Sequence, residues 1–532
     1  MVKVPLLSCT LGVLLLLSVG WLPYRAELSS LYEDGELTTV SRETGGLAPA
    51  SDACFLRGTA DPTYPIIDPV LLHSTSLGGS SKDEAWSIAV DREGNTYISG
   101  ITHSPDFPGT TLGGNAAEKN VFVAKYTPTG ELAYATVIGG ESGEEGNAIA
   151  VDDYGNAYVA GETYSTSFPL LNPWRSAFGY EEAFLLKFDA AGQLSYSTFI
   201  GGTLGEEVND IVADAVGNVY LGGEVYSDDY PLLNPWSATT YGDDDEDAFI
   251  TIFDAAGEMA YSTLISASSR DQVFRIAVDD EGYVYGTGMT SSPDFPTVNA
   301  FQTTYGGEWD DCFVFKLDPW RNEMLYSTLL GGNGRDECWG IAVDDEGSAY
   351  VTGFTSSNNF PLAKPIQSSL AGSDDVFITK LSPTGDQLLF STYIGGEGRD
   401  RAWDLALDGG GNVYVVGETD SPDFPTVDAI QGHHRGEMDG FLLVLDQANT
   451  IRYASYIGGF DYDRAYSIAL DENWIVHVAG ATDSTDFPRT DGAAAFAGNT
   501  DAFVAQYGLV PTPTPTPTPI PQAAATVGPE GG

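Results

Sequence analysis

A Phe-Pro dipeptide, replaced once by Tyr-Pro, recurs along this chain at nearly equal intervals. The aromatic residues of the seven copies are Phe107, Phe168, Tyr230, Phe295, Phe360, Phe424 and Phe487. Successive copies lie 61, 62, 65, 65, 64 and 63 residues apart. Self-similarity at a fixed period is typical of a repeat architecture, so the unit of this fold is one repeat.

Each repeat contains four short apolar runs, seen best from Leu388 onwards in LLFSTYIGG, DLALD, GNVYVVGET and DGFLLVLD. Runs of this length, rich in Val and Tyr and bounded by turn residues, predict β-strands. An Asp-x-x-Gly-Asn turn, as at 91–95, joins the first two strands, and its Gly suits a left-handed backbone. In the last copy Trp474 stands where Gly is expected, so we expect Asn473 to take the left-handed conformation there.

Seven units of four antiparallel strands predict an all-β fold, a seven-bladed β-propeller. The last copy ends after its third strand, at 501–510, whereas an unmatched fourth strand, VLLHSTSLGG, stands at 70–79 before the first copy. We expect strand 70–79 to complete the last blade and close the ring, which leaves no open edge. An open solenoid is the alternative, but it does not explain this permutation.

The two ends of the chain predict export and tethering. Lys3 is the only charge before the apolar run 4–22, so 1–26 is interpreted as a signal peptide, with an uncleaved signal anchor as the alternative. Residues 27–69 are interpreted as a flexible acidic leader, 70–510 as the propeller, and 511–532 as a Pro/Thr-rich spacer and tail. We therefore expect a secreted or cell-surface protein of prokaryotic type.

The net charge of the chain limits the classes of partner that it can bind. Among 532 residues, 76 Asp and Glu oppose 23 Lys and Arg, which gives a formal charge of −53. Such a surface repels phosphate, so we expect neither nucleic acid nor direct membrane contact by the propeller. Adaptation to high salt is another interpretation of the acidity. Hydrophobic residues at 42% and aromatic residues at 12% exclude a disordered acidic chain.

Cysteine usage is sparse. Cys9 lies in the signal segment, which leaves Cys54, Cys312 and Cys338, an odd number. We interpret Cys312 and Cys338 as buried small hydrophobic side chains, with a disulfide between them as the alternative.

The STxxGG, DxxGNxYVxG and DxFxxK blocks of the repeat resemble the SBBP family of exported, cell-surface prokaryotic proteins. The resemblance covers 70–508 and implies a seven-bladed propeller and export, but no particular activity. The fourth copy departs from the pattern, because Ile265, Ser266 and Ala267 replace Ile-Gly-Gly, and this puts the shape of that loop in doubt.

Acidic residues recur where loops enter strands. Before the first strand stand Asp83, Glu144, Glu206, Asp271, Asp336, Asp400 and Asp463, and before the third stand Asn120, Glu182, Asp247, Asp311, Asp375, Asp439 and Asp501. Strand direction places both sets on one face, together with the long loops that carry Phe-Pro. Two rings of carboxylates would suit Ca²⁺, which takes oxygen ligands. The preferred interpretation is local, with each Asp accepting backbone N–H bonds where a loop enters a strand.

Two further groups are candidate ligand contacts. The sequence DDDED, containing Asp243, Asp244, Asp245 and Asp247, is a candidate metal loop, although a solvated acidic loop is favoured because the calcium-loop Gly and distal Glu are missing. Aromatic side chains are candidate glycan contacts, with core packing as the alternative. They are Trp86, Trp339 and Trp403 just after the start of first strands, and Trp174 and Trp236 in long loops.

No catalytic constellation is present, because the five His lack metal-site spacing and no nucleophile elbow or phosphate loop occurs. We therefore expect a non-catalytic binding or structural module, a monomeric propeller that meets a protein or glycan through its long-loop face. A carbohydrate-active enzyme using acids of that face and a Ca²⁺-dependent adhesion module are the alternatives. No cofactor is expected, with Ca²⁺ as the exception under the last alternative.

Overall fold

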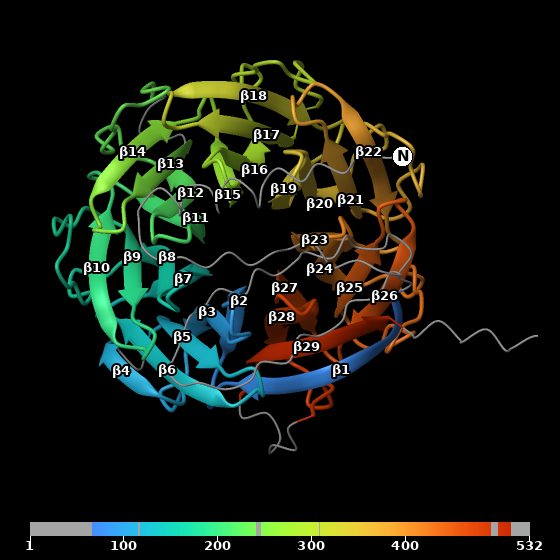
Figure 1. Cartoon of the computed structure of the whole chain (residues 1–532), viewed down its shortest axis with the longest axis horizontal. Coiled ribbons are helices and arrows are strands. Elements are labelled where there is room, and N and C mark those ends of the chain that lie inside the picture. Colours follow the sequence, from blue (N-terminus) through green and yellow to red (C-terminus); the bar gives the residue numbers. More distant parts are fainter. Residues whose placement is uncertain (1–65, 115–117, 241–245, 308, 491–497, 512–532) are drawn as a thin grey trace, which may run out of the picture. The chain divides into compact units, whose positions relative to one another are not determined.

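The computed structural model describes residues 66–114, 118–240, 246–307, 309–490 and 498–511. These residues form seven sheets arranged as a seven-bladed β-propeller (Figure 1), as the sequence predicts. No helix in these ranges has the length and apolar character to cross a bilayer. The predicted signal segment, most of the leader and the spacer after residue 511 lie outside the described residues.

Each blade places its first strand innermost, near the axis of the ring, and its fourth strand outermost (Figure 1). Blade 1 contains β2 (Asp83–Val90), β3 (Thr96–Thr102), β5 (Asn120–Tyr126) and β6 (Leu132–Gly139), with the short β4 (Thr110–Gly113) outside β6. Blade 2 contains β7 (Glu144–Val151), β8 (Ala157–Thr163), β9 (Glu182–Phe188) and β10 (Leu194–Ile200). Blade 3 contains β11 (Glu206–Ala213), β12 (Val219–Val225), β13 (Asp247–Phe253) and β14 (Met259–Leu264).

The remaining blades repeat this order. Blade 4 contains β15 (Asp271–Val278), β16 (Val284–Thr290), β17 (Asp311–Asp318) and β18 (Glu323–Leu330). Blade 5 contains β19 (Asp336–Val343), β20 (Ala349–Thr355), β21 (Asp375–Leu381) and β22 (Leu388–Ile394). Blade 6 contains β23 (Asp400–Leu407), β24 (Val413–Thr419), β25 (Asp439–Leu445) and β26 (Ile451–Ile457). Blade 7 contains β27 (Asp463–Leu470), β28 (Ile475–Thr482), β29 (Asp501–Pro511) and β1 (Ile66–Leu77).

The core lies between blades, which explains the repeated Phe-Pro dipeptide. Second strands such as β3 and β8 are buried along their whole length, because both of their faces lie against neighbouring blades. The aromatic residue of each dipeptide is buried and packs on the Phe of the third strand of its own blade. In all seven blades the ring centroids lie 4.5–5.0 Å apart. The dipeptide therefore anchors each long loop to its sheet.

The predicted closure is confirmed. β1 pairs antiparallel with β29, with Leu71 opposite Tyr507 and Ser76 opposite Phe503. The observed strand starts at Ile66, four residues earlier than predicted, and ends at Leu77. β2 of blade 1 contacts β27 and β28 of blade 7, so the ring is continuous.

The long loops do not lie wholly on one face of the ring. After Phe-Pro each loop runs beside the outer strand of its own blade, where Leu171 bridges Ser197 and Val298 bridges Ser327. In blade 1 this segment is β4, parallel to β6. The loops thus cover the outer edges, which would otherwise offer unpaired backbone groups, and only their two ends belong to the face.

Two local predictions are wrong, and one doubt is removed. Cys312 in β17 and Cys338 in β19 form a disulfide between blades 4 and 5, because inter-blade packing brings their Cα atoms to 5.3 Å. Trp474 itself takes the left-handed conformation, with φ of 63°, because the turn requires it at that position. In the fourth copy the Ala267 N–H donates to Asp271 at 2.6 Å, as the equivalent Gly does elsewhere, so that loop keeps its shape.

Candidate functional site

The face formed by the entrances to the first and third strands is called here the long-loop face. At each entrance the first acidic residue holds the loop that precedes it. The Asp83 carboxylate accepts the Gly79 N–H and the Ser104 hydroxyl, both at 2.7 Å. The equivalent backbone bond spans 2.6–3.0 Å in all seven copies. This set of acids therefore builds the loops, as the local interpretation predicts.

The second set of acids faces the first across each blade junction. A Cβ added at Gly458 would lie 2.2 Å from Asp439 Oδ1 and 2.8 Å from Asp463 Oδ2, so these carboxyl groups flank one glycine. Both side chains are 0% exposed, and among the described residues the Oδ1 atom of Asp439 has no hydrogen-bond partner. Burial raises the pKa of Asp463 to about 7 and that of Asp439 to about 6. Such a pair is stable when the two carboxyl groups share a proton.

Two junctions reduce their charge by other means. At the junction of blades 1 and 2, the uncharged Asn120 takes the place of the second acid, opposite Glu144. At the next junction, Arg175 forms an ion pair with Glu182, which lies opposite Glu206. These substitutions indicate that the fold does not tolerate two full charges at this place.

The residues described contain no group of three or more His, Cys, Asp or Glu side chains able to hold a metal. The metal role of Asp83, Asp271, Asp336, Asp400 and Asp463 stays a prediction. Asp243, Asp244 and Asp245 lie outside the described residues, and Asp247 begins β13 as a member of the second set.

Trp86, Trp339 and Trp403 occupy a β-bulge that interrupts the first strand of every blade. Trp339 stacks on Phe274 of blade 4 at 4.1 Å and meets Trp403 of blade 6 edge-on at 5.1 Å. Trp86 and Trp339 each donate their indole N–H to a Glu two residues earlier, at 3.1 and 2.8 Å. These contacts join the inner strands of neighbouring blades, and a role in ligand binding stays a prediction.

Trp174 and Trp236 lie on the outer wall, where each long loop turns back. Trp174 is partly buried, and its ring meets Phe253 of the next blade edge-on at 5.6 Å. Trp236 packs against a cluster shared by blades 3 and 4. The structure therefore does not bring these two residues together with the acids of the long-loop face.

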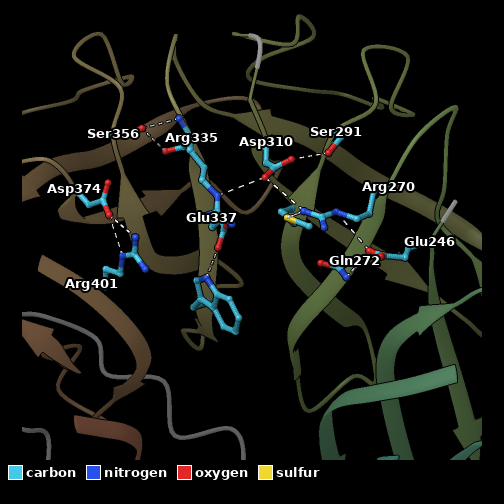
Figure 2. A network of polar contacts seen from close by, with 12 residues as sticks. Glu246, Arg270, Gln272, Ser291, Asp310, Arg335, Glu337, Ser356, Asp374 and Arg401 are labelled. Carbon is cyan, nitrogen blue, oxygen red and sulfur yellow. Dashed lines mark hydrogen bonds and ion pairs between the residues drawn. The ribbon is translucent and has the colours of Figure 1, made fainter. Parts of the chain in front are cut away.

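A polar network joins blades 3 to 6 across the long-loop face (Figure 2). Asp310 accepts the Ser291 hydroxyl at 2.6 Å and pairs with Arg270 at 3.6 Å and with Arg335 at 3.5 Å. Arg335 also pairs with Glu337, and Arg401 pairs with Asp374 at 2.5 Å. Except for Ser291, which follows the end of β16 (Val284–Thr290), these side chains come from the entrances to the first and third strands.

Beside this network lies a pocket of about 700 Å³. Its lining includes Tyr305, Trp309 and Asp310, and the Trp309 side chain is 63% exposed. A smaller pocket of about 340 Å³ lies between blades 6 and 7, lined in part by Ile430, Arg435 and Tyr507. Sequence reasoning missed both pockets. The available signal was Trp309, because no other copy has Trp at that position.

One position of the long-loop face varies within a constant frame. The residue directly before the first acid of each blade accepts, through its carbonyl, a backbone bond of 2.8–3.1 Å in all seven copies. Its side chain nevertheless differs from blade to blade. The residues are Lys82, Gly143, Gly205, Arg270, Arg335, Arg399 and Tyr462.

A match to a known repeat family agrees with the repeat seen in the sequence and in the fold. The model of the beta-propeller repeat SBBP matches residues 74–108, 134–169, 260–296, 325–361 and 389–425. The regulatory protein FlaEY of Caulobacter vibrioides is 25% identical over 328 residues, which cover 56% of this chain and 32% of FlaEY. This chain therefore spans about a third of the length of that relative.

Solved structures with similarity to this chain have lower sequence identity. Sqt1 from Chaetomium thermophilum is 11% identical with a TM-score of 0.39, covering 78% of this chain and 82% of Sqt1. Quinohemoprotein alcohol dehydrogenase from Comamonas testosteroni is 13% identical with a TM-score of 0.41, covering 84% of this chain and 77% of the enzyme. Likenesses at these scores carry no argument about activity. The five matched segments, however, agree with the motifs of the sequence, and the chain carries the SBBP beta-propeller repeat.

Proposed function

We propose that this protein is a non-catalytic binding module of the cell surface, which meets a protein or glycan through its long-loop face. The observation that carries the proposal concerns the residue directly before the first acid of each blade, which is called here the variable entrance position. Seven copies share one backbone frame, but their side chains at that position are cationic, absent or aromatic. A constant scaffold that presents differing side chains on one face is typical of recognition surfaces.

The chemistry of the face supports binding over catalysis. The acids at its strand entrances are buried and hold loops, and its exposed side chains include Trp309, Tyr180 and Arg335. Aromatic and Arg side chains are the residues that contribute most to binding surfaces. The match to a stretch of a protein named as regulatory agrees with a binding role. Export and surface location rest on the predicted signal and spacer segments.

The proposal is tested with the full chain, labelled and applied to a glycan array and to intact bacterial cells. Trp309→Ala should reduce binding at least tenfold, because Trp309 is exposed beside the 700 Å³ pocket. Trp320→Ala is the matched control, since Trp320 is 56% exposed but lies in the β17–β18 turn on the opposite face. Equal loss in both variants, or glycan hydrolysis by the pure protein, would contradict the proposal.

A further inference from the structure

Seven equivalent sets of three side chains surround the mouth of the ring, one at each blade junction. Each set combines the last residue but one of a second strand, the residue before the following third strand, and the second residue of the next blade's first strand. In order around the ring the sets are Ile101, Lys119, Glu145; Glu162, Glu181, Glu207; Glu224, Glu246, Gln272; Met289, Asp310, Glu337; Phe354, Asp374, Arg401; Glu418, Met438, Arg464; and Ala481, Thr500, Glu84.

Six of these sets contain or contact a cation of the chain itself. Lys119 pairs with Glu145, Arg401 with Asp374, and Arg464 with Glu418. In the other three sets the cation comes from the variable entrance position. Those pairs are Arg270 with Glu246, Arg335 with Asp310 and Glu337, and Lys82 with Glu84. Charge compensation is therefore the rule at this place.

The set at the junction of blades 2 and 3 breaks the rule. It consists of Glu162, Glu181 and Glu207, and none of the three forms an ion pair within the part of the chain that the structure describes. Glu207 occupies the position of Arg401 and Arg464, and Gly205 occupies that of Arg270 and Arg335. Lys119 forms its ion pair with Glu145, and its charge also acts on Glu162 and Glu207 from a greater distance.

Glu162 gives an independent indication that a partner is missing. It is only 5% exposed, yet its hydrogen-bonding contacts among the described residues are the carboxyl groups of Glu181 and Glu207, with no N–H or hydroxyl donor. Glu207 has the Asn147 amide at 3.0 Å, and Glu181 has the Tyr164 hydroxyl. Burial first, and then the charge of Glu207, raises the pKa of Glu162 far above its usual range. A buried carboxyl group whose hydrogen-bonding contacts are other acids is costly to ionise when no cation is in direct contact with it.

We propose that Glu162, Glu181 and Glu207, with Tyr164 beside them and Tyr180 directly before Glu181 in the chain, form a recognition site for an arginine or lysine side chain of a protein partner. The proposal deepens the proposed function, because it names the chemistry of the partner at one place on the long-loop face. Tyr164 and Tyr180 are 40% and 75% exposed, and aromatic rings beside carboxylates attract a guanidinium or ammonium group. A metal ion fits less well, because none of the described residues form a group of three ligating side chains.

The chain itself offers a variant that should fill the site. A Cβ at Gly205 would lie 3.4 Å from Glu181 Oε2, and its closest contact is the edge of the Tyr226 ring at 3.3 Å. Gly205→Arg therefore places a guanidinium where Arg270 and Arg335 stand in the next two blades. Glu207→Arg reproduces Arg401 and Arg464 and serves as a second variant. Gly143→Arg is the matched control, because a side chain there points toward Lys119, 3.6 Å away.

The experiment titrates the full chain with the peptides acetyl-Gly-Arg-Gly-amide and acetyl-Gly-Lys-Gly-amide by calorimetry, and in a separate arm with CaCl₂. The native chain should bind one peptide, Gly205→Arg and Glu207→Arg should weaken that binding at least tenfold, and Gly143→Arg should change it less than twofold. Absence of peptide binding by the native chain, or equal binding by Gly205→Arg, would overturn the inference. One Ca²⁺ bound by the native chain and lost in Gly205→Arg would overturn it in favour of a metal site.

The two proposals fail separately. If cell or array binding by the full chain persists in Gly205→Arg but is lost in Trp309→Ala, the binding role of the face stands and only the basic-residue site is rejected. If the peptide binds and the array and cells show nothing, the site stands and the surface role is rejected.

Discussion

Replacement of Asp463 by Asn should change how the stability of the protein depends on pH. The folded protein raises the pKa of Asp463 from 3.8 to about 7, chiefly through burial. In the unfolded chain the Asp463 carboxyl group is ionised above about pH 5, whereas in the folded protein it keeps its proton until about pH 7. Stability from this group is therefore present at low pH and is lost as pH rises. At about 1.4 kcal/mol per pH unit, the loss between pH 5 and pH 8 is about 3 kcal/mol.

Asn cannot ionise, and its carbonyl can accept the Gly459 N–H and Ser484 hydroxyl that Asp463 accepts. Urea unfolding followed by Trp fluorescence at pH 5, 6, 7 and 8 should show the native chain losing about 3 kcal/mol more than Asp463→Asn across this range. Asp106→Asn is the control, because Ser80 lowers the pKa of this exposed carboxylate. Parallel pH profiles for the native chain and Asp463→Asn would refute the shared-proton reasoning.

Two further changes test local features. Joint replacement Cys312→Ala and Cys338→Ala opens a loop of 26 residues and should lower the free energy of unfolding by about 3.5 kcal/mol, measured by urea unfolding with the reduced native chain alongside. Equal midpoints for oxidised and reduced chains would contradict this. Trp474→Gly removes a side chain from a left-handed position and should raise the free energy of unfolding by about 1 kcal/mol, whereas a loss of stability would show that the indole packs favourably.

The fold could be predicted from sequence because each constraint repeats seven times. One Phe-Pro dipeptide is a weak signal, but seven at a nearly constant spacing fix both the unit and the number of blades. The closure followed from a strand missing at the end and present at the start, since an incomplete blade would expose an edge. The two ends of the closing strand differed from the prediction, because it runs from Ile66 to Leu77 instead of from 70 to 79.

The features that were missed depend on contacts between blades. Cys312 and Cys338 lie in different repeats, so only packing shows that they meet. Glu162 and Glu181 were missed because acids were compared only with the equivalent positions of other repeats. These two residues lie near Glu207 because blades 2 and 3 meet at a junction. A signal was nevertheless present at Glu207, which occupies the position of Arg401 and Arg464 in two other copies. That Trp309 lines a pocket likewise depends on the course of its loop, which the sequence does not show.

The long-loop face requires a ring closed by β1, and hydrogen exchange of the full chain tests this closure most directly. If β1 is the outer strand of blade 7, the amides of residues 70–77 that bond to β29 should exchange as slowly as those of 501–508, and both segments should lose protection together in urea. Fast exchange of 70–77 while 501–508 stays protected would contradict the closed propeller.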